Sequence, residues 1–192
     1  VMLLQVGGAV PRSALELYCS LAREWRNAAP EASDKARAQM DLLLGGWKRV
    51  FKTATLDKIE RYYASADNAV LKQLDTNQTA FEVTQRNMAA ARSAKRRPDL
   101  EAAKDTLWKL AETYERLGHN LRASEAWENV AVAMNALPDI TLTERRDAVF
   151  ALERYKEMRE GWEYTEEPLY KQNLAWLKAT KADLDATEKR SK

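Results

Sequence analysis

Apolar residues recur at intervals of three and four along most of this chain, which is the spacing of one face of a helix. Val, Ile and Thr never cluster in the strict alternation that a half-buried strand requires. The pattern predicts an all-α protein of about eight helices in antiparallel pairs. We expect them over residues 13–29, 34–51, 55–74 and 77–95, from Asp99 to Gly118 and on to about Val130, from Thr141 to Gly161, and over 165–186.

Local signals set the ends of several of these helices. Pro30 and Pro98 close the helices that precede them, because proline lacks the amide hydrogen that a helix interior needs. Gly118 lies where a helix C-terminus favours a left-handed residue. Thr141 and Glu144 have the spacing of a capping box, in which each residue satisfies an amide of the other. The loops are therefore short, and short loops make consecutive helices antiparallel neighbours.

The expected organisation is one helical domain over residues 13–186, between an N-terminal tail at 1–12 and a frayed tail at 187–192. Thr165 should cap the last helix, with Glu166 and Glu167 in its first turn, where the helix dipole favours negative charge. Stacked helix pairs of this kind form a short solenoid or a curved bundle.

The same periodicity predicts which side chains face inward. These are Leu56, Ile59, Tyr63, Ala66, Val70 and Leu74; Phe81, Thr84, Met88 and Ala91; Ala148, Ala151, Leu152, Tyr155 and Met158; and Leu169, Leu174, Trp176, Leu177 and Leu184.

One hairpin in the middle of the chain carries a resemblance to a known family. Its large and small residues, Leu107, Leu110, Ala111, Tyr114, Ala123 and Trp127, lie at the usual positions of a tetratricopeptide repeat (TPR). The spacing of Leu110, Gly118, Ala123, Trp127, Val130 and Pro138-Asp139 resembles a pentatricopeptide repeat (PPR) slightly better. The resemblance implies a PPR/TPR-like solenoid, which binds through its surface.

The PPR resemblance also bears on the partner. RNA-binding PPR proteins read bases with a polar residue of the first helix, and here Trp108 or Lys109 occupies that position, although Asp139 matches at the end of the repeat. The resemblance therefore does not favour sequence-specific RNA binding. PPR-like proteins that read no bases serve as structural subunits of organellar assemblies. This chain is similar in size and helical character to the small PPR-like accessory subunits on the catalytic head of euglenozoan mitochondrial ATP synthase, which implies a location in the mitochondrial matrix.

Charge and composition exclude some functions. The net charge is only +2, from 31 basic and 29 acidic side chains, whereas a nucleic-acid binder usually has a clear basic excess. No apolar run reaches the roughly 20 residues that a membrane-spanning helix needs. The one cysteine, Cys19, is expected to be a structural thiol.

Candidate catalytic chemistry is sparse. The one histidine, His119, has no Cys or carboxylate partners at metal-ligand spacing, and we expect it to interact with the C-terminus of the helix before it. The chain contains no phosphate-binding loop, dinucleotide fingerprint or zinc-protease motif. The sequence therefore predicts no catalytic residue, cofactor, metal or small-molecule substrate.

The candidate protein interface consists of Trp108, next to the apolar stripe of its helix, and a basic cluster: Arg92, Lys95, Arg96 and Arg97. Cations at a helix C-terminus are favoured by the helix dipole alone, so this cluster has three interpretations: local stabilisation, an acidic protein partner, or RNA phosphates. The leading hypothesis is a non-catalytic helical-repeat subunit of a larger protein complex. The alternatives are a PPR-like RNA-binding protein of an organelle, and an enzyme whose site spans distant carboxylates.

Overall fold

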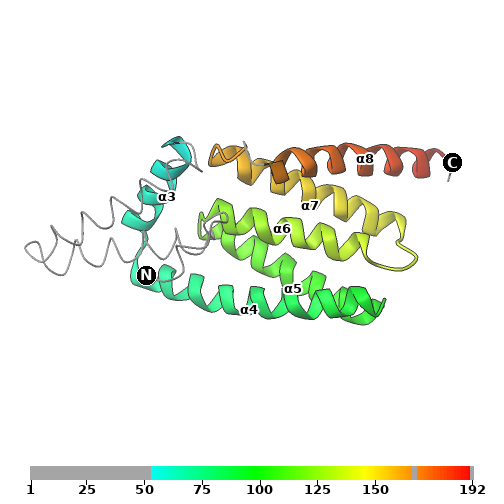
Figure 1. Cartoon of the computed structure of the whole chain (residues 1–192), viewed down its shortest axis with the longest axis horizontal. Coiled ribbons are helices and arrows are strands. Elements are labelled where there is room, and N and C mark those ends of the chain that lie inside the picture. The colour runs from blue at the N-terminus through cyan, green and yellow to red at the C-terminus, as the bar shows by residue number, and fades with distance from the viewer. Residues whose placement is uncertain (1–52, 166–167, 191–192) are drawn as a thin grey trace, which may run out of the picture. The chain divides into compact units, whose positions relative to one another are not determined.

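A computed structural model of the chain describes residues 53–165 and 168–190 (Figure 1). This part of the chain is 86% helix and contains no strand, which confirms the all-α prediction. The described helices are α3 (Thr53–Ser65), α4 (Asn68–Ser93), α5 (Arg97–Arg116), α6 (Asn120–Asn135), α7 (Leu142–Gly161) and α8 (Pro168–Arg190). The helices expected over 13–29 and 34–51, the tail over 1–12, Pro30 and Cys19 lie outside the described residues.

The chain forms two units, one up to Asp67 and one from Asn68 onward. This division falls inside the segment 55–74, which the sequence predicts as a single helix, so that prediction is wrong. The chain leaves the helix at Ala66 and Asp67. Asp and Asn are common at helix N-termini, and Asp67 is followed by Asn68 at the start of α4.

The break that the sequence predicts near residue 75 does not occur, because α4 runs through it. Thr76 Oγ1 donates a hydrogen bond to the carbonyl of Lys72 at 3.0 Å, and Thr79 Oγ1 donates to the carbonyl of Asp75 at 3.3 Å. Such bonds to the preceding turn let polar residues continue a helix.

The second unit contains α4 to α8, and each of these helices packs on the next one in the chain (Figure 1). The most extensive packing is that of α6 against α5 and α7. Helix α6 is buried on most of its surface, and its buried residues are Leu121, Ala123, Ser124, Ala126, Trp127, Val130, Ala131, Ala133 and Met134. Four alanines among them let the neighbouring backbones approach closely.

Side-chain contacts also join helices that are two apart in the chain. Gln85 of α4 donates to Asn129 of α6 at 3.2 Å, and Asn173 of α8 donates to Glu128 of α6 at 2.9 Å. Two ion pairs join α5 to α7. Arg97 meets Glu144 near the start of both helices, and Glu115 meets Arg154 farther along both. The two are therefore parallel, and these contacts group α4, α6 and α8 together and α5 with α7.

The turn between α4 and α5 differs from the sequence prediction. Pro98 does not close α4: it lies in the first turn of α5, after Arg96 at the N-cap. Proline is accepted there because the first amides of a helix have no intrahelical partner. Lys95 adopts a left-handed conformation with φ 51°, which lets the chain reverse between the two helices.

The turn between α5 and α6 contains the predicted left-handed glycine, Gly118, with φ 73°. The amide of His119 donates to the carbonyl of Tyr114 at 2.9 Å, which closes the end of α5. The His119 side chain also stabilises the start of α6. It is buried and caps the next helix, since its Nδ1 accepts a hydrogen bond from the amide of Arg122 at 3.4 Å.

Helix α7 begins with the predicted capping box. The amide of Glu144 donates to Thr141 Oγ1 at 3.2 Å, and the amide of Thr141 donates to Glu144 Oε2 at 2.7 Å. The expected inward stripe of this helix is buried, with Met158 half-buried at its edge.

Helix α8 differs from its prediction at both ends. It begins at Pro168, after Thr165; Glu166 and Glu167 lie outside the described residues. It continues past Ala186 to Arg190. Leu169 was expected inside but is 39% exposed, whereas Leu177 is buried as expected. Ion pairs join this helix to α7: Arg145–Asp183, Arg146–Glu188 and Glu153–Lys181. These pairs hold the C-terminal turns in place, where the sequence predicts fraying.

Candidate protein-binding surface

Three aromatic side chains from three helices form what we call the aromatic cluster: Trp108 of α5, Trp127 of α6 and Phe150 of α7. The rings of Trp108 and Phe150 are stacked, with centroids 5.5 Å apart and 12° between their planes. Trp127 meets both rings edge-on, at 4.9 Å and 5.6 Å. Trp127 is only 2% exposed, Trp108 is half-buried, and Phe150 is 43% exposed. The cluster is therefore anchored in the core and open to solvent at Phe150.

Local sequence explains why Trp108 and Phe150 lie at the surface. Leu107, Leu110 and Ala111 take the buried face of α5, so Trp108 lies on its flank. In the same way Phe150 lies outside the buried face of α7, between Val149 and Ala151. Because α5 and α7 are parallel neighbours, their off-face aromatics meet above Trp127.

The polar edges of the rings are satisfied within the chain. The indole nitrogen of Trp108 donates to Glu112 Oε1 at 2.9 Å, and that of Trp127 donates to Glu115. Glu115 also forms a bidentate ion pair with Arg154. The hydrogen bond that Arg154 donates to Glu115 raises the pKa of the Arg154 guanidinium above its ordinary value; partial burial opposes this. Two carboxylates of α5 therefore hold both indole rings in place.

The same seam between α5 and α7 is closed at its other end by Arg97. Its guanidinium donates to the carbonyl of Pro138 at 2.6 Å, pairs with Glu101 at 2.8 Å and pairs with Glu144. Burial by itself raises the pKa of the Glu144 carboxyl, but hydrogen bonds from Thr141 and the charge of Arg97 outweigh it. The pKa of Glu144 therefore lies below its ordinary value of 4.5.

The four residues of the predicted basic cluster lie in and around the tight turn between α4 and α5. Arg92 lies in the last turn of α4 and Lys95 in the following turn, and both are exposed. Arg96 pairs with Asp99 at 2.8 Å, and Arg97 is bound to its own chain. The sequence predicts all four residues in the last turn of one helix, and this prediction is wrong, because Arg96 and Arg97 lie at the start of α5. Trp108, the other predicted interface residue, lies in the aromatic cluster.

Sequence reasoning did not single out Phe150. The signal was nevertheless the one that drew attention to Trp108: a large aromatic residue one position off an apolar helical stripe. Of the other tryptophans, Trp162 is buried beside His119, with ring centroids 5.1 Å apart, and Trp176 is half-buried. Trp25 and Trp47 lie outside the described residues.

Other kinds of site have little support in the described part of the chain. No group of three metal-ligating side chains occurs there. No helix within the described ranges is long and apolar enough to cross a membrane. A hollow of about 340 Å³ between α4 and α5 is lined by small or polar side chains, including Thr84, Asn87, Ala90 and Thr106.

Comparison of the chain with protein-family models, with curated proteins and with solved structures gives no match.

Proposed function

We propose that this protein is a non-catalytic helical-repeat subunit that docks on a larger protein assembly, with the aromatic cluster as its anchor. The observation that carries the proposal is the exposed Phe150, held flat against Trp108 above the buried Trp127. Aromatic residues that are rigidly held and partly exposed are frequent hot spots of protein interfaces.

The rigidity of the aromatic cluster favours binding. A side chain that is already ordered loses little conformational entropy when a partner covers it, so more of the burial energy contributes to binding. The stacking on Trp108 and the edge-on contact with Trp127 fix the Phe150 ring before any partner arrives.

The arrangement of the helices supports a repeat architecture. In a helical-repeat protein the first helices of successive hairpins are parallel neighbours, and so are the second helices. The α5–α7 contacts, together with those that join α4, α6 and α8, agree with this scheme. The hairpin α5–α6 is the one whose residues resemble a PPR or TPR unit.

The finer proposal is an accessory subunit on the catalytic head of mitochondrial ATP synthase, in the matrix. Its support is the similarity in size and helical character to the PPR-like accessory subunits of that enzyme. Native electrophoresis of mitochondrial extracts tests this. We expect the protein to comigrate with the catalytic head and to remain with it when the membrane sector is removed. Comigration with a different complex would contradict the finer proposal and leave the docking proposal standing.

The docking proposal is tested by replacing the anchor in the tagged full-length protein. We expect Phe150→Ala to reduce recovery of the assembly at least tenfold, since loss of a hot spot costs about 2 kcal/mol or more. Val83→Ala is the matched control, because Val83 is 42% exposed on α4 and lies outside the cluster. Unfolding midpoints of both variants verify that the fold is retained.

Equal recovery with both variants would contradict the docking proposal. So would tight, sequence-selective RNA binding by the isolated protein, which is the outcome that the PPR-like RNA-binding alternative predicts.

A further inference from the structure

We infer that the aromatic cluster receives a cationic segment of the partner protein, in which arginine or lysine flanks an apolar side chain. This inference rests on the proposed docking function and specifies the chemistry of the partner. Its basis is the charge around the aromatic cluster.

Carboxylates surround the stacked pair of rings, and we call them the acidic rim. On a helix, residues three, four and seven apart lie on the same face. By this spacing Asp105 and Glu112 flank Trp108 on α5, and Asp147, Glu153 and Glu157 flank Phe150 on α7. None of these five is buried.

Lys109 and Arg116, at helical spacing from Glu112, form no ion pair in the described part of the chain. Four other cations near the rim are already paired. They are Lys104 with Asp105 at 2.8 Å, Arg146 with Glu188 at 2.8 Å, Arg154 with Glu115 and Glu157, and Lys181 with Glu153. Glu112 and Asp147, by contrast, have no ion pair within the described part of the chain. The two helices that carry the exposed rings, α5 and α7, therefore each have a carboxylate without an ion pair beside the aromatic cluster.

Aromatic faces and carboxylates favour the same kind of group. The face of a tryptophan or phenylalanine ring attracts a cation, and a guanidinium can stack on the ring while it hydrogen-bonds to a carboxylate. An arginine over Phe150 would meet both partners at once, with Glu112 and Asp147 on either side. Phosphates would be repelled by the same carboxylates, so this surface disfavours the RNA backbone.

The test uses two synthetic amphipathic peptides of about 18 residues, or five helical turns, with one apolar stripe in common. One has arginine on its polar face and the other glutamate. Each is titrated into the full-length protein, and binding is measured by fluorescence anisotropy. We expect the arginine peptide to bind at least tenfold more tightly, and Phe150→Ala to abolish this difference.

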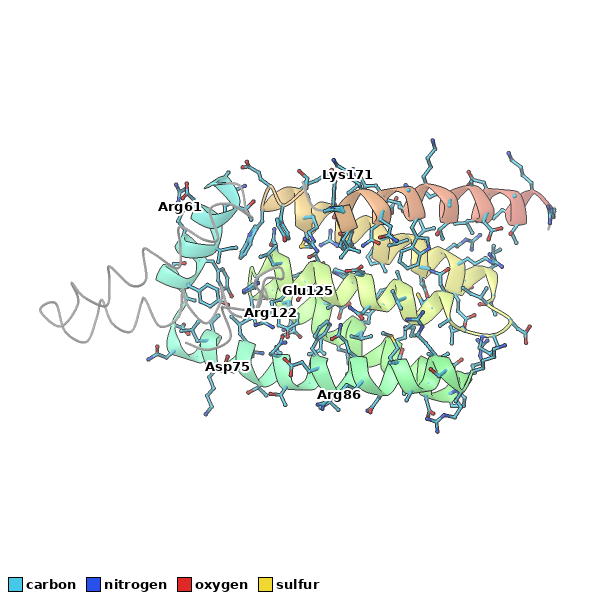
Figure 2. All side chains as sticks on the ribbon, viewed as in Figure 1. Arg61, Asp75, Arg86, Arg122, Glu125 and Lys171 are labelled. Carbon is cyan, nitrogen blue, oxygen red and sulfur yellow. The ribbon has the colours of Figure 1, made fainter. Side chains whose placement is uncertain are left out.

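Removal of two carboxylates tests whether the acidic rim contributes to binding. We expect Glu112→Gln combined with Asp147→Asn to weaken binding of the arginine peptide about tenfold, because two exposed charges are lost. Asp75→Asn combined with Glu82→Gln, which removes two exposed charges from α4 (Asp75 is labelled in Figure 2), should leave the affinity unchanged. Glutamate-peptide binding of equal strength, or an unchanged affinity of the rim variant, would overturn the inference. Binding of a poly(U) oligonucleotide that is lost in Phe150→Ala would overturn it in favour of base stacking.

A photo-crosslinking residue at position 150 of the full-length protein, within its native assembly, separates the two proposals. Crosslinks to a partner segment rich in arginine and lysine would support both. Crosslinks to a segment without basic residues would overturn the inference while the docking function stands. Retention of the assembly by Phe150→Ala would instead count against the docking function at this surface.

Discussion

Arg97 ties the first turn of α5 to the loop before α7, through the carbonyl of Pro138, and to the first turn of α7, through the carboxylate of Glu144. We expect Arg97→Ala to lower the free energy of unfolding by about 1–3 kcal/mol, because the substitution removes charged hydrogen bonds to both groups. Arg92→Ala, in the exposed last turn of α4, should change it by less than about 0.5 kcal/mol. Urea denaturation of both variants measures the difference. Equal effects would mean that the Arg97 contacts contribute nothing.

Glu144 should make stability depend on pH in a defined direction. Its pKa is lower in the folded chain than its ordinary value of 4.5, so the folded state holds its proton less tightly than the unfolded state. The resulting stabilisation is present above pH 4.5 and is lost as the pH falls through the folded-state pKa. We expect Glu144→Gln to be less stable than the native chain at pH 7, with a smaller difference near pH 3. Denaturation midpoints at both pH values test this, and a constant difference would contradict it.

At the scale of the helices, the α5–α6 hairpin depends on a small residue at the crossing. Ala123, Ala111 and Tyr114 are all buried. We expect Ala123→Leu to cost about 1–3 kcal/mol, because a packed core cannot accept three more carbons without shifting side chains. Ala102→Leu, at an exposed position of α5, is the control and should cost less than about 0.5 kcal/mol. Thermal melts compare the two, and a wild-type midpoint for Ala123→Leu would show that the hairpin is not tightly packed.

The link between α5 and α7 can be measured by a double-mutant cycle on Glu115 and Arg154. Both side chains are mostly buried, and Glu115 also accepts from Trp127. We expect Glu115→Gln and Arg154→Met to show a coupling energy of about 0.5–2 kcal/mol. The more exposed pair Arg146–Glu188 should couple by less than about 0.5 kcal/mol. Similar coupling in the two pairs would mean that burial adds nothing to the Glu115 link.

At the scale of the whole molecule, the charge distribution argues against RNA as the ligand. The net charge is +2, and two residues of the predicted basic cluster, Arg96 and Arg97, are paired with carboxylates of the chain. We expect no sequence-specific RNA binding at physiological salt in a gel-shift assay. Replacing Arg92, Lys95 and Arg96 by alanine should leave the protein assembly intact. Arg97 is kept in this variant, because its loss would destabilise the fold and confuse the result.

The sequence alone determined the features that depend on neighbouring residues in the chain. Helical periodicity identified buried residues of α4 and α7, since an amphipathic stripe is a property of one helix. It also identified the left-handed Gly118 and the capping box of Thr141 and Glu144, because both are closed by hydrogen bonds within a few residues. The all-helical class followed from the same local signals.

Other features were decided only when helices were placed beside one another. The sequence leaves open whether the polar run after Leu74 ends a helix. It also leaves open whether Pro98 ends one helix or starts the next. Both outcomes depend on the packing of α4 and α5. Arg97 meets Glu144 across 47 residues, and Glu115 meets Arg154 across 39. Phe150 stacks on Trp108 because α7 lies parallel to α5 and brings the two rings to the same height. A contact between distant segments produces no periodic pattern in the sequence of either segment, so the tertiary structure alone determines it.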